Sequence, residues 1–302
     1  MIKNYKKKKI LITGAFGVIG LSLIEELRCN YDLVCLVRKT KKNSLIASKM
    51  LGINVTFGDL SKASVIARAL SGCEFVIHLA FLDPETAELD PQTTYENNVN
   101  GTINLLNSIK EINPKIKIVF LSSIAAYFYE KLLSNKKLLA TLRYKEYARQ
   151  KIECEKNIKK SGLSYCILRS GAILPNVVSE LDVRRFSEMN IPGDTKFQFI
   201  CVNDLVDAIK TLCEKKIDKK TFLIGGGKSF RLHYIDFLKN ISNTLSLRQI
   251  RKSENLNGEY YSEWFNTSMS QKYLNYQNRT FSDYLKEIKI KFLKDHKKSH
   301  PF

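Results

Sequence analysis

The chain has 302 residues, 44% of them hydrophobic, and carries 49 basic against 30 acidic residues for a formal net charge of +19 at pH 7. No run approaches the roughly 20 apolar residues of a membrane span, and the seven cysteines are scattered without a C-x-x-C pair, so we expect no membrane partner, no metal site and a cytoplasmic location. The surplus charge is spread along the whole chain, which argues against a specific nucleic acid partner and leaves a small-molecule substrate as the expected one.

Short apolar, β-type runs alternate with helical patterns from the start of the chain. We expect strands at residues 10–13, 33–37, 55–57, 75–80, 117–122, 164–169 and 222–224. We expect helices at residues 18–27, 44–51, 63–70, 95–109 and 143–160. This alternation predicts an α/β fold with a Rossmann-type, doubly wound parallel sheet of about seven strands, whose ligand binds at the carboxyl ends of the strands.

The alternation ends after residue 174. Residues 175–196 read as irregular, and residues 232–240 and 280–294 read as helices. We therefore expect a larger domain of residues 1–174, then a small C-terminal α/β cap of residues 175–302 interleaved with the last strand of the core. Whether the protein forms a homodimer is left open by the sequence.

Three glycines spaced three apart follow the first expected strand, in the stretch KILITGAFGVIG. Gly14 would permit the tight turn out of the strand, Gly17 would let the backbone approach a pyrophosphate, and Gly20 would let the next helix pack closely on the sheet. The N-terminus of that helix supplies N–H groups and a partial positive charge for phosphates. This pattern predicts a dinucleotide site.

Candidate catalytic side chains follow the fifth expected strand, which ends at Ser122 and Ser123. Tyr147 and Lys151 come later, four residues apart on one face of an expected helix. The same Tyr-x-x-x-Lys spacing begins at Tyr5 and at Tyr127. However, the first precedes the sheet, and the second lies in what we expect to be a loop, too near the strand to begin a new helix.

Further motifs occur in a fixed order along the chain. They are Gly58-Asp59-Leu60, His78-Leu79-Ala80, Asn98-Val99-Asn100-Gly101-Thr102, Leu168-Arg169-Ser170-Gly171, Phe199-Ile200-Cys201-Val202-Asn203-Asp204, Asn266-Thr267-Ser268 and Tyr273-Leu274-Asn275-Tyr276. From about Lys9 to Ile288 the chain resembles the extended branch of the short-chain dehydrogenase/reductase superfamily. That group contains NAD-dependent epimerases and dehydratases and the dihydroflavonol-reductase-like enzymes.

The resemblance implies a role for each candidate catalytic residue. Tyr147 would be the general acid/base, with its phenol pKa lowered by the Lys151 ammonium. Lys151 would also hold the nicotinamide ribose, and Ser123 would hydrogen-bond the substrate oxygen.

The resemblance also implies a set of dinucleotide-binding residues, in which Asp59 and Leu60 border the adenine and Asn98 supports the active-site helix. The full set is Gly14, Ala15, Phe16, Gly17, Val18, Ile19, Gly20, Arg38, Asp59, Leu60, Leu79, Ala80, Asn98, Ser122, Tyr147 and Lys151.

The choice of cofactor depends on the end of the second strand. An acid there suits the ribose hydroxyls of NAD, whereas an arginine suits the 2′-phosphate of NADP. Arg38 occupies this place. We therefore expect NADP(H) to be favoured, with NAD(H) as the alternative.

Two departures from the nucleotide-sugar enzymes of this group bear on the substrate. Ser170 stands where proline is usual, and only a short segment, residues 176–198, precedes the next motif. This favours a smaller or more open pocket. The leading hypothesis is NADPH-dependent reduction of a small-molecule carbonyl with Tyr147 as proton donor. The alternatives are a nucleotide-sugar epimerase or dehydratase with retained NAD and a non-catalytic NADP-binding regulatory protein.

Overall fold

The computed structural model describes residues 7–247 and 260–299, which cluster by their contacts into two units. Unit 1 comprises residues 7–126, 144–169 and 209–222, and unit 2 comprises residues 127–143, 170–208, 223–247 and 260–299. The contacts thus return residues 209–222 to unit 1 and place residues 127–143 in unit 2. The division into folding domains at residue 174 stays a prediction.

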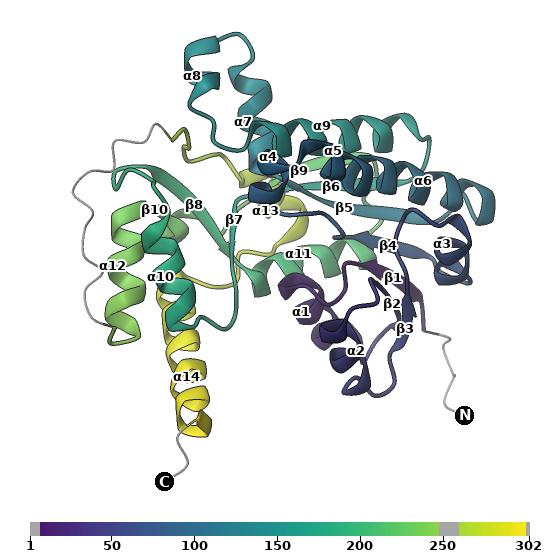
Figure 1. The fold of residues 1–302 in the computed structure, drawn as a ribbon, viewed down its shortest axis with the longest axis horizontal. Coiled ribbons are helices and arrows are strands. Elements are labelled where there is room, and N and C mark those ends of the chain that lie inside the picture. The colour runs from purple at the N-terminus through teal and green to yellow at the C-terminus, as the bar shows by residue number, and fades with distance from the viewer. Residues whose placement is uncertain (1–6, 248–259, 300–302) are drawn as a thin grey trace. The chain divides into compact units, whose positions relative to one another are not determined.

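Unit 1 is built on a seven-stranded sheet (Figure 1) with the strand order β3-β2-β1-β4-β5-β6-β9. Its strands are β1 (Lys9–Thr13), β2 (Asp32–Val37), β3 (Asn54–Phe57), β4 (Phe75–His78), β5 (Lys117–Ser123), β6 (Tyr165–Ser170) and β9 (Lys220–Ile224). Strands β1 to β5 pair in parallel, which confirms the predicted Rossmann-type sheet. The strand order reverses between β1 and β4, where open α/β sheets bind their ligands.

The helices of unit 1 follow the strands in alternation. They are α1 (Val18–Leu27), α2 (Lys41–Ser48), α3 (Ala63–Leu70), α4 (Pro84–Leu89), α5 (Pro91–Tyr95), the π-helix η1 (Glu96–Asn100), α6 (Gly101–Ile112) and α9 (Lys145–Lys160). The helix expected at residues 95–109 is therefore divided by one π-helical turn. The unpredicted helices α4 and α5 both begin with an aspartate N-cap followed by proline, Asp83-Pro84 and Asp90-Pro91, which is a local start signal.

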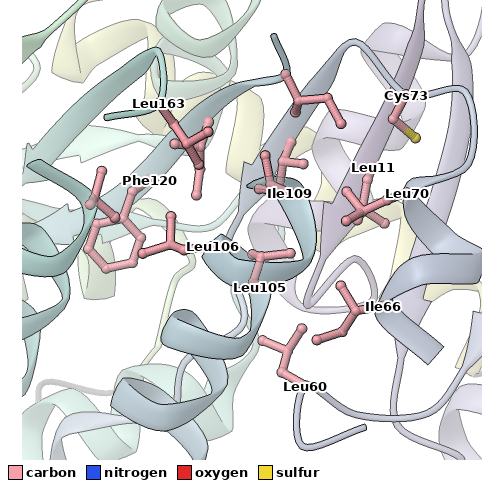
Figure 2. Close-up of a cluster of buried hydrophobic side chains, with 14 of the residues drawn as sticks. Leu11, Leu60, Ile66, Leu70, Cys73, Leu105, Leu106, Ile109, Phe120 and Leu163 are labelled. Atoms are coloured by element: carbon pink, nitrogen blue, oxygen red, sulfur yellow. The ribbon is translucent and has the colours of Figure 1, made fainter. Parts of the chain in front are cut away.

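A hydrophobic cluster joins α3, α6 and α9 to one face of the sheet (Figure 2). Alternate strand residues such as Leu11 and Phe120 point into it, because successive side chains of a strand face opposite sides. In this cluster Leu105 and Ile109 of α6 lie toward Ile66 and Leu70 of α3, and Leu106 lies beside Phe120. Truncating a leucine in such a core costs about 2–5 kcal/mol, so this cluster holds the helices that carry the site.

Unit 2 contains a three-stranded sheet, β10-β8-β7, and several helices. Its elements are β7 (Ala172–Leu174), β8 (Lys196–Cys201), β10 (Arg231–His233), α8 (Lys136–Ala140), α10 (Glu180–Glu188), the 3-10 turn η2 (Lys228–Phe230), α12 (Tyr234–Thr244), α13 (Ser268–Leu274) and α14 (Phe281–Ser299). Helices α7 (Ile124–Leu132) and α11 (Val202–Glu214) each run from one unit into the other.

Two local predictions were wrong. Residues 175–196 are not irregular throughout, because Ser179 and Asp182 form a reciprocal capping box that starts α10. Tyr127 does not lie in a loop, because α7 begins at Ile124, directly after β5. Helical position therefore does not by itself separate the Tyr127 pair from the Tyr147 pair.

Among the residues that the structure describes, no helix combines the length and apolar character needed to cross a bilayer. Within that same part of the chain, no three acidic, histidine or cysteine side chains gather into a candidate metal site.

Candidate active site

A cavity of about 320 Å³ opens in unit 1 at the carboxyl ends of β1 to β4, a size typical of small-molecule sites. Nine of the predicted dinucleotide-binding residues line it: Gly14, Phe16, Gly17, Arg38, Asp59, Leu60, Leu79, Ala80 and Asn98. The other predicted residues do not line it: Ala15, Val18, Ile19, Gly20, Ser122, Tyr147 and Lys151. We refer to this cavity as the cleft.

The glycines of the first loop have different reasons to be glycine. Gly14 has a φ of +68°, and a Cβ there would lie 2.8 Å from the backbone nitrogen of Ala80. At Gly20 a Cβ would lie 2.3 Å from the carbonyl oxygen of Ala15. At Gly17 a Cβ would meet only Gly14 O at 3.4 Å, although Gly17 lines the cleft. Protein packing therefore does not require a glycine there, whereas a pyrophosphate at the start of α1 would.

The outer end of the cleft is polar. Arg38 is exposed there, and its carbonyl oxygen accepts a hydrogen bond of 2.8 Å from Asn43 Nδ2, on α2. Asp59 accepts hydrogen bonds from the hydroxyl and the backbone nitrogen of Ser61, and these bonds hold its pKa below the usual range. A cation and a carboxylate therefore both face the position that the resemblance assigns to the adenosine.

Phe81 lies at the inner end of the cleft, directly after Ala80. The Lys151 Nζ atom sits 3.5 Å from the centroid of the Phe81 ring and donates to the carbonyl oxygen of Leu121 at 2.7 Å. The Tyr147 ring meets Phe81 edge-on at 5.4 Å, and its centroid lies 5.6 Å from Nζ. The structure thus brings Tyr147 and Lys151 together, with Phe81 between them and the cleft.

Burial controls the ionisation of both residues. Lys151 is 3% exposed, and desolvation lowers its pKa to about 7. Burial raises the pKa of Tyr147, and the charges of Asp83 and Glu85 raise it further. The expected lowering of the Tyr147 pKa is therefore wrong for this arrangement, because burial and two nearby carboxylates raise it.

Buried side-chain hydrogen bonds tie the end of β5 to α9. The Ser122 hydroxyl donates to Glu155 Oε1 at 2.6 Å, and Arg169 grips the same carboxylate with two hydrogen bonds of 2.8 and 2.7 Å. Ser122 thus serves the contact between β5 and α9 with its side chain. Ser123 Oγ accepts from the backbone nitrogen of Ala125 at 3.1 Å.

Asn98 lies in the π-helical turn and is buried. Its Oδ1 atom accepts from the backbone nitrogen of Leu82 at 2.7 Å, and its Nδ2 atom donates to Gln150 Oε1 at 2.8 Å. Asn98 therefore supports α9, as the resemblance implies, through Gln150, which lies between Tyr147 and Lys151 on that helix.

His78 is a buried structural residue. Ala80 N donates to Thr13 Oγ1, and Thr102 Oγ1 donates to the carbonyl oxygen of Asn98. The Thr13 hydroxyl can then donate to His78 Nδ1 at 2.7 Å, and His78 Nε2 to Thr102 at 2.9 Å, so this network suits the neutral ring. Burial, aided by the Lys151 charge, lowers the pKa of His78 to about 3.

Among the residues of the site that the sequence analysis did not single out are Asn43, Phe81, Leu82 and Gln150. Phe81 and Leu82 directly follow the His78-Leu79-Ala80 motif, so the carboxyl-end rule could have found them. Asn43 and Gln150 had no local signal, because their roles depend on packing between distant segments.

Comparisons with known proteins agree with this geometry. A model of the NAD dependent epimerase/dehydratase family matches residues 10–225. UDP-glucose 4-epimerase of Vibrio cholerae is 26% identical over 247 residues, covering 73% of this chain and 71% of that protein. UDP-glucuronate 4-epimerase 1 of Arabidopsis thaliana is 33% identical over 131 residues, and the match covers 39% of this chain but only 30% of that relative's length.

A solved structure shows the same fold. UDP-glucuronic acid 4-epimerase from Bacillus cereus, in complex with UDP-glucuronic acid and NAD, superposes with a TM-score of 0.73 at 20% identity. The superposition covers 95% of this chain and 99% of that one.

Proposed function

The chain belongs to the NAD-dependent epimerase/dehydratase family, whose members are enzymes of the extended short-chain dehydrogenase/reductase type, and from this premise we propose that it inverts a ring carbon of a nucleotide-activated sugar. One observation carries the proposal: Tyr147 and Lys151 meet beside Phe81, a residue that lines the cleft with the glycine loop. The named relatives, which act on UDP-sugars, support the choice of substrate. The sequence-based preference for small-molecule carbonyl reduction thereby becomes the second candidate.

We propose NAD as the bound cofactor, held by the glycine loop at the start of α1 and by the side of the cleft that Leu79 and Ala80 form. When bound, the nicotinamide would accept a hydride from the sugar carbon and later return one to the opposite face of that carbon. Lys151 would hold the adjoining ribose with its ammonium.

Tyr147 would first lose its phenol proton to solvent, and the phenolate would then take the proton of the reacting sugar hydroxyl as its carbon loses a hydride. That proton would return in the second half of the cycle. Burial raises the pKa of Tyr147, so the phenolate needs a nearby positive charge to form. The Lys151 ammonium, 5.6 Å from its ring centroid, is the positive charge that favours the phenolate. Ser123 Oγ accepts from Ala125 N, so its own proton can be donated to the substrate oxygen.

Arg38 supports the second candidate, an NADPH-dependent carbonyl reductase. Its guanidinium lies at the outer end of the cleft, where it suits a 2′-phosphate. The non-catalytic alternative finds no support, because the family consists of enzymes.

The experiment that tests the proposal uses the purified, full-length protein without added cofactor. Nucleotide released on denaturation is identified by mass spectrometry, and UDP-hexoses and UDP-uronic acids are followed by proton NMR. Formation of a sugar epimer with retained NAD supports the proposal. Consumption of added NADPH by a carbonyl compound, with no epimer from any nucleotide sugar, would favour the reductase.

A further inference from the structure

Phe81 lines the cleft and also contacts the Lys151 ammonium. It is half-buried and packs against the core cluster beside Phe120. The distance of 3.5 Å from Nζ to its ring centroid is well inside the roughly 6 Å range of cation–π contacts. The ring therefore covers one side of the ammonium.

The contact between the Phe81 ring and Lys151 affects the charge state of the lysine as well as its position. The face of an aromatic ring carries a negative potential, which attracts an ammonium and has little effect on a neutral amine. The attraction is largest where water is excluded, and Lys151 is 3% exposed. Leu121 O accepts one N–H of the ammonium at 2.7 Å, so strand β5 and the ring together fix the position of Nζ.

Few other charges face Lys151. From its own helix, Glu155 and Cys154 favour the charged form, although Arg169 of β6 pairs with that glutamate. His78 of β4 is neutral, and the nearby groups of β5 are uncharged hydroxyls. Asp83 and Glu85, in and before α4, act on Tyr147.

We propose that Phe81 is a positioning residue that favours the protonated form of Lys151 and holds it against Leu121 O, so that a positive charge is favoured beside the wall of the cleft before the ribose arrives. The use of that charge in catalysis rests on the proposed function. The contact between Phe81 and Lys151 does not depend on the proposed function.

The test is a titration of Lys151 in the full-length protein, freed of nucleotide and labelled with ¹³C at the lysine ε carbons. The Lys151 signal is identified by its loss in Lys151→Arg. We expect a midpoint near the pKa of about 7 that burial gives Lys151. We expect Phe81→Leu to lower it by about one unit or more, because the charged form loses its aromatic partner.

Three variants separate the aromatic face from packing. Phe81→Tyr keeps the aromatic ring and should leave the Lys151 midpoint within a few tenths of a unit. Phe81→Met keeps a flexible apolar side chain in the same place but no ring, so it should lower the midpoint as Phe81→Leu does. Phe75→Leu, in β4 and over Lys8 rather than Lys151, should change nothing. An unchanged midpoint in both the Leu and Met variants, or an equal fall in Phe81→Tyr, would overturn the proposal.

This titration needs no substrate. A lowered midpoint in a protein that epimerises nothing would refute the proposed function and leave the role of Phe81 standing. An active epimerase whose Lys151 midpoint is unchanged in Phe81→Leu and Phe81→Met would support the proposed function and refute the role of Phe81.

Discussion

Asn98 Nδ2 donates to Gln150 Oε1 across 2.8 Å, which joins the π-helical turn η1 to the helix that carries Tyr147 and Lys151. Gln150 in turn donates to Thr94 Oγ1 at 2.9 Å. Because the other amide atom of Asn98 accepts from Leu82 N, one buried side chain sets both the inner wall of the cleft and the active-site helix. π-Helical turns occur often at functional sites, and here the turn places this amide.

Replacing Asn98 with alanine should lower both stability and turnover. The part-buried Leu82 N and the buried Gln150 Oε1 would lose their partner, at about 1–3 kcal/mol for a buried unsatisfied group. The free energy of unfolding should therefore fall by about 2 kcal/mol or more in chemical denaturation. Asn100→Ala, on the exposed side of the same turn, is the matched control. Equal effects from both variants would show that this amide network does not support the site.

The Glu155 carboxylate should matter more than an exposed glutamate. It is 1% exposed and holds Arg169 and Ser122. Removing one partner of a buried ion pair costs about 3–5 kcal/mol, so Glu155→Ala should lose that much stability in urea titrations. Glu111→Ala, exposed on α6, should stay within about 0.5 kcal/mol of the unmodified protein. A similar, small loss at both positions would refute the anchoring role.

His78 should make folding depend on pH below neutrality. Its pKa is about 3 in the folded protein against about 6.5 in an unfolded chain. Between these values the unfolded state binds more protons, so this stabilisation is present above pH 6.5 and is lost as the pH falls toward 3.

His78→Gln removes the titrating group and keeps hydrogen-bonding atoms. The stability of the unmodified protein relative to this variant should fall by roughly 2 kcal/mol between pH 6.5 and pH 5, measured by denaturant titration at each pH. A constant difference would mean that His78 is not held neutral.

Arg38 should bind the 2′-phosphate of NADP if that cofactor enters the cleft. Arg38→Asp should weaken NADP(H) at least about tenfold in fluorescence titrations, because a bidentate cation is replaced by an anion. NAD(H) should be much less affected. Lys49→Asp makes the same change in net charge at the far end of α2 and should leave both affinities alone. An Arg38 variant that still binds NADP(H) normally would remove the basis for the reductase candidate.

The parts of this molecule that could be predicted from sequence depend on local pattern. The strands are short apolar runs, and the spacing of Gly14, Gly17 and Gly20 is set by one turn and one helix start. The helical pair Tyr147 and Lys151 is likewise a matter of spacing within α9.

What could not be predicted depends on contacts between distant segments. Asn98 and Gln150 lie 52 residues apart and meet only because α9 returns beside the π-helical turn. The direction of the Tyr147 pKa depends on burial and on carboxylates from another helix. The helix that contains Tyr127 starts without any break after β5, so an expected loop turned out helical.

The comparison of Tyr147→Phe with Tyr127→Phe tests the central claim most directly, because both tyrosines lie on helices and both precede a lysine by four residues. Epimer formation from a nucleotide sugar is followed by proton NMR in each variant. Loss of the acid–base hydroxyl should lower turnover by at least about 100-fold in Tyr147→Phe, with the fold and bound NAD retained, while Tyr127→Phe stays near the unmodified rate. Full activity in Tyr147→Phe, or its loss in Tyr127→Phe alone, would contradict the assignment of this active site.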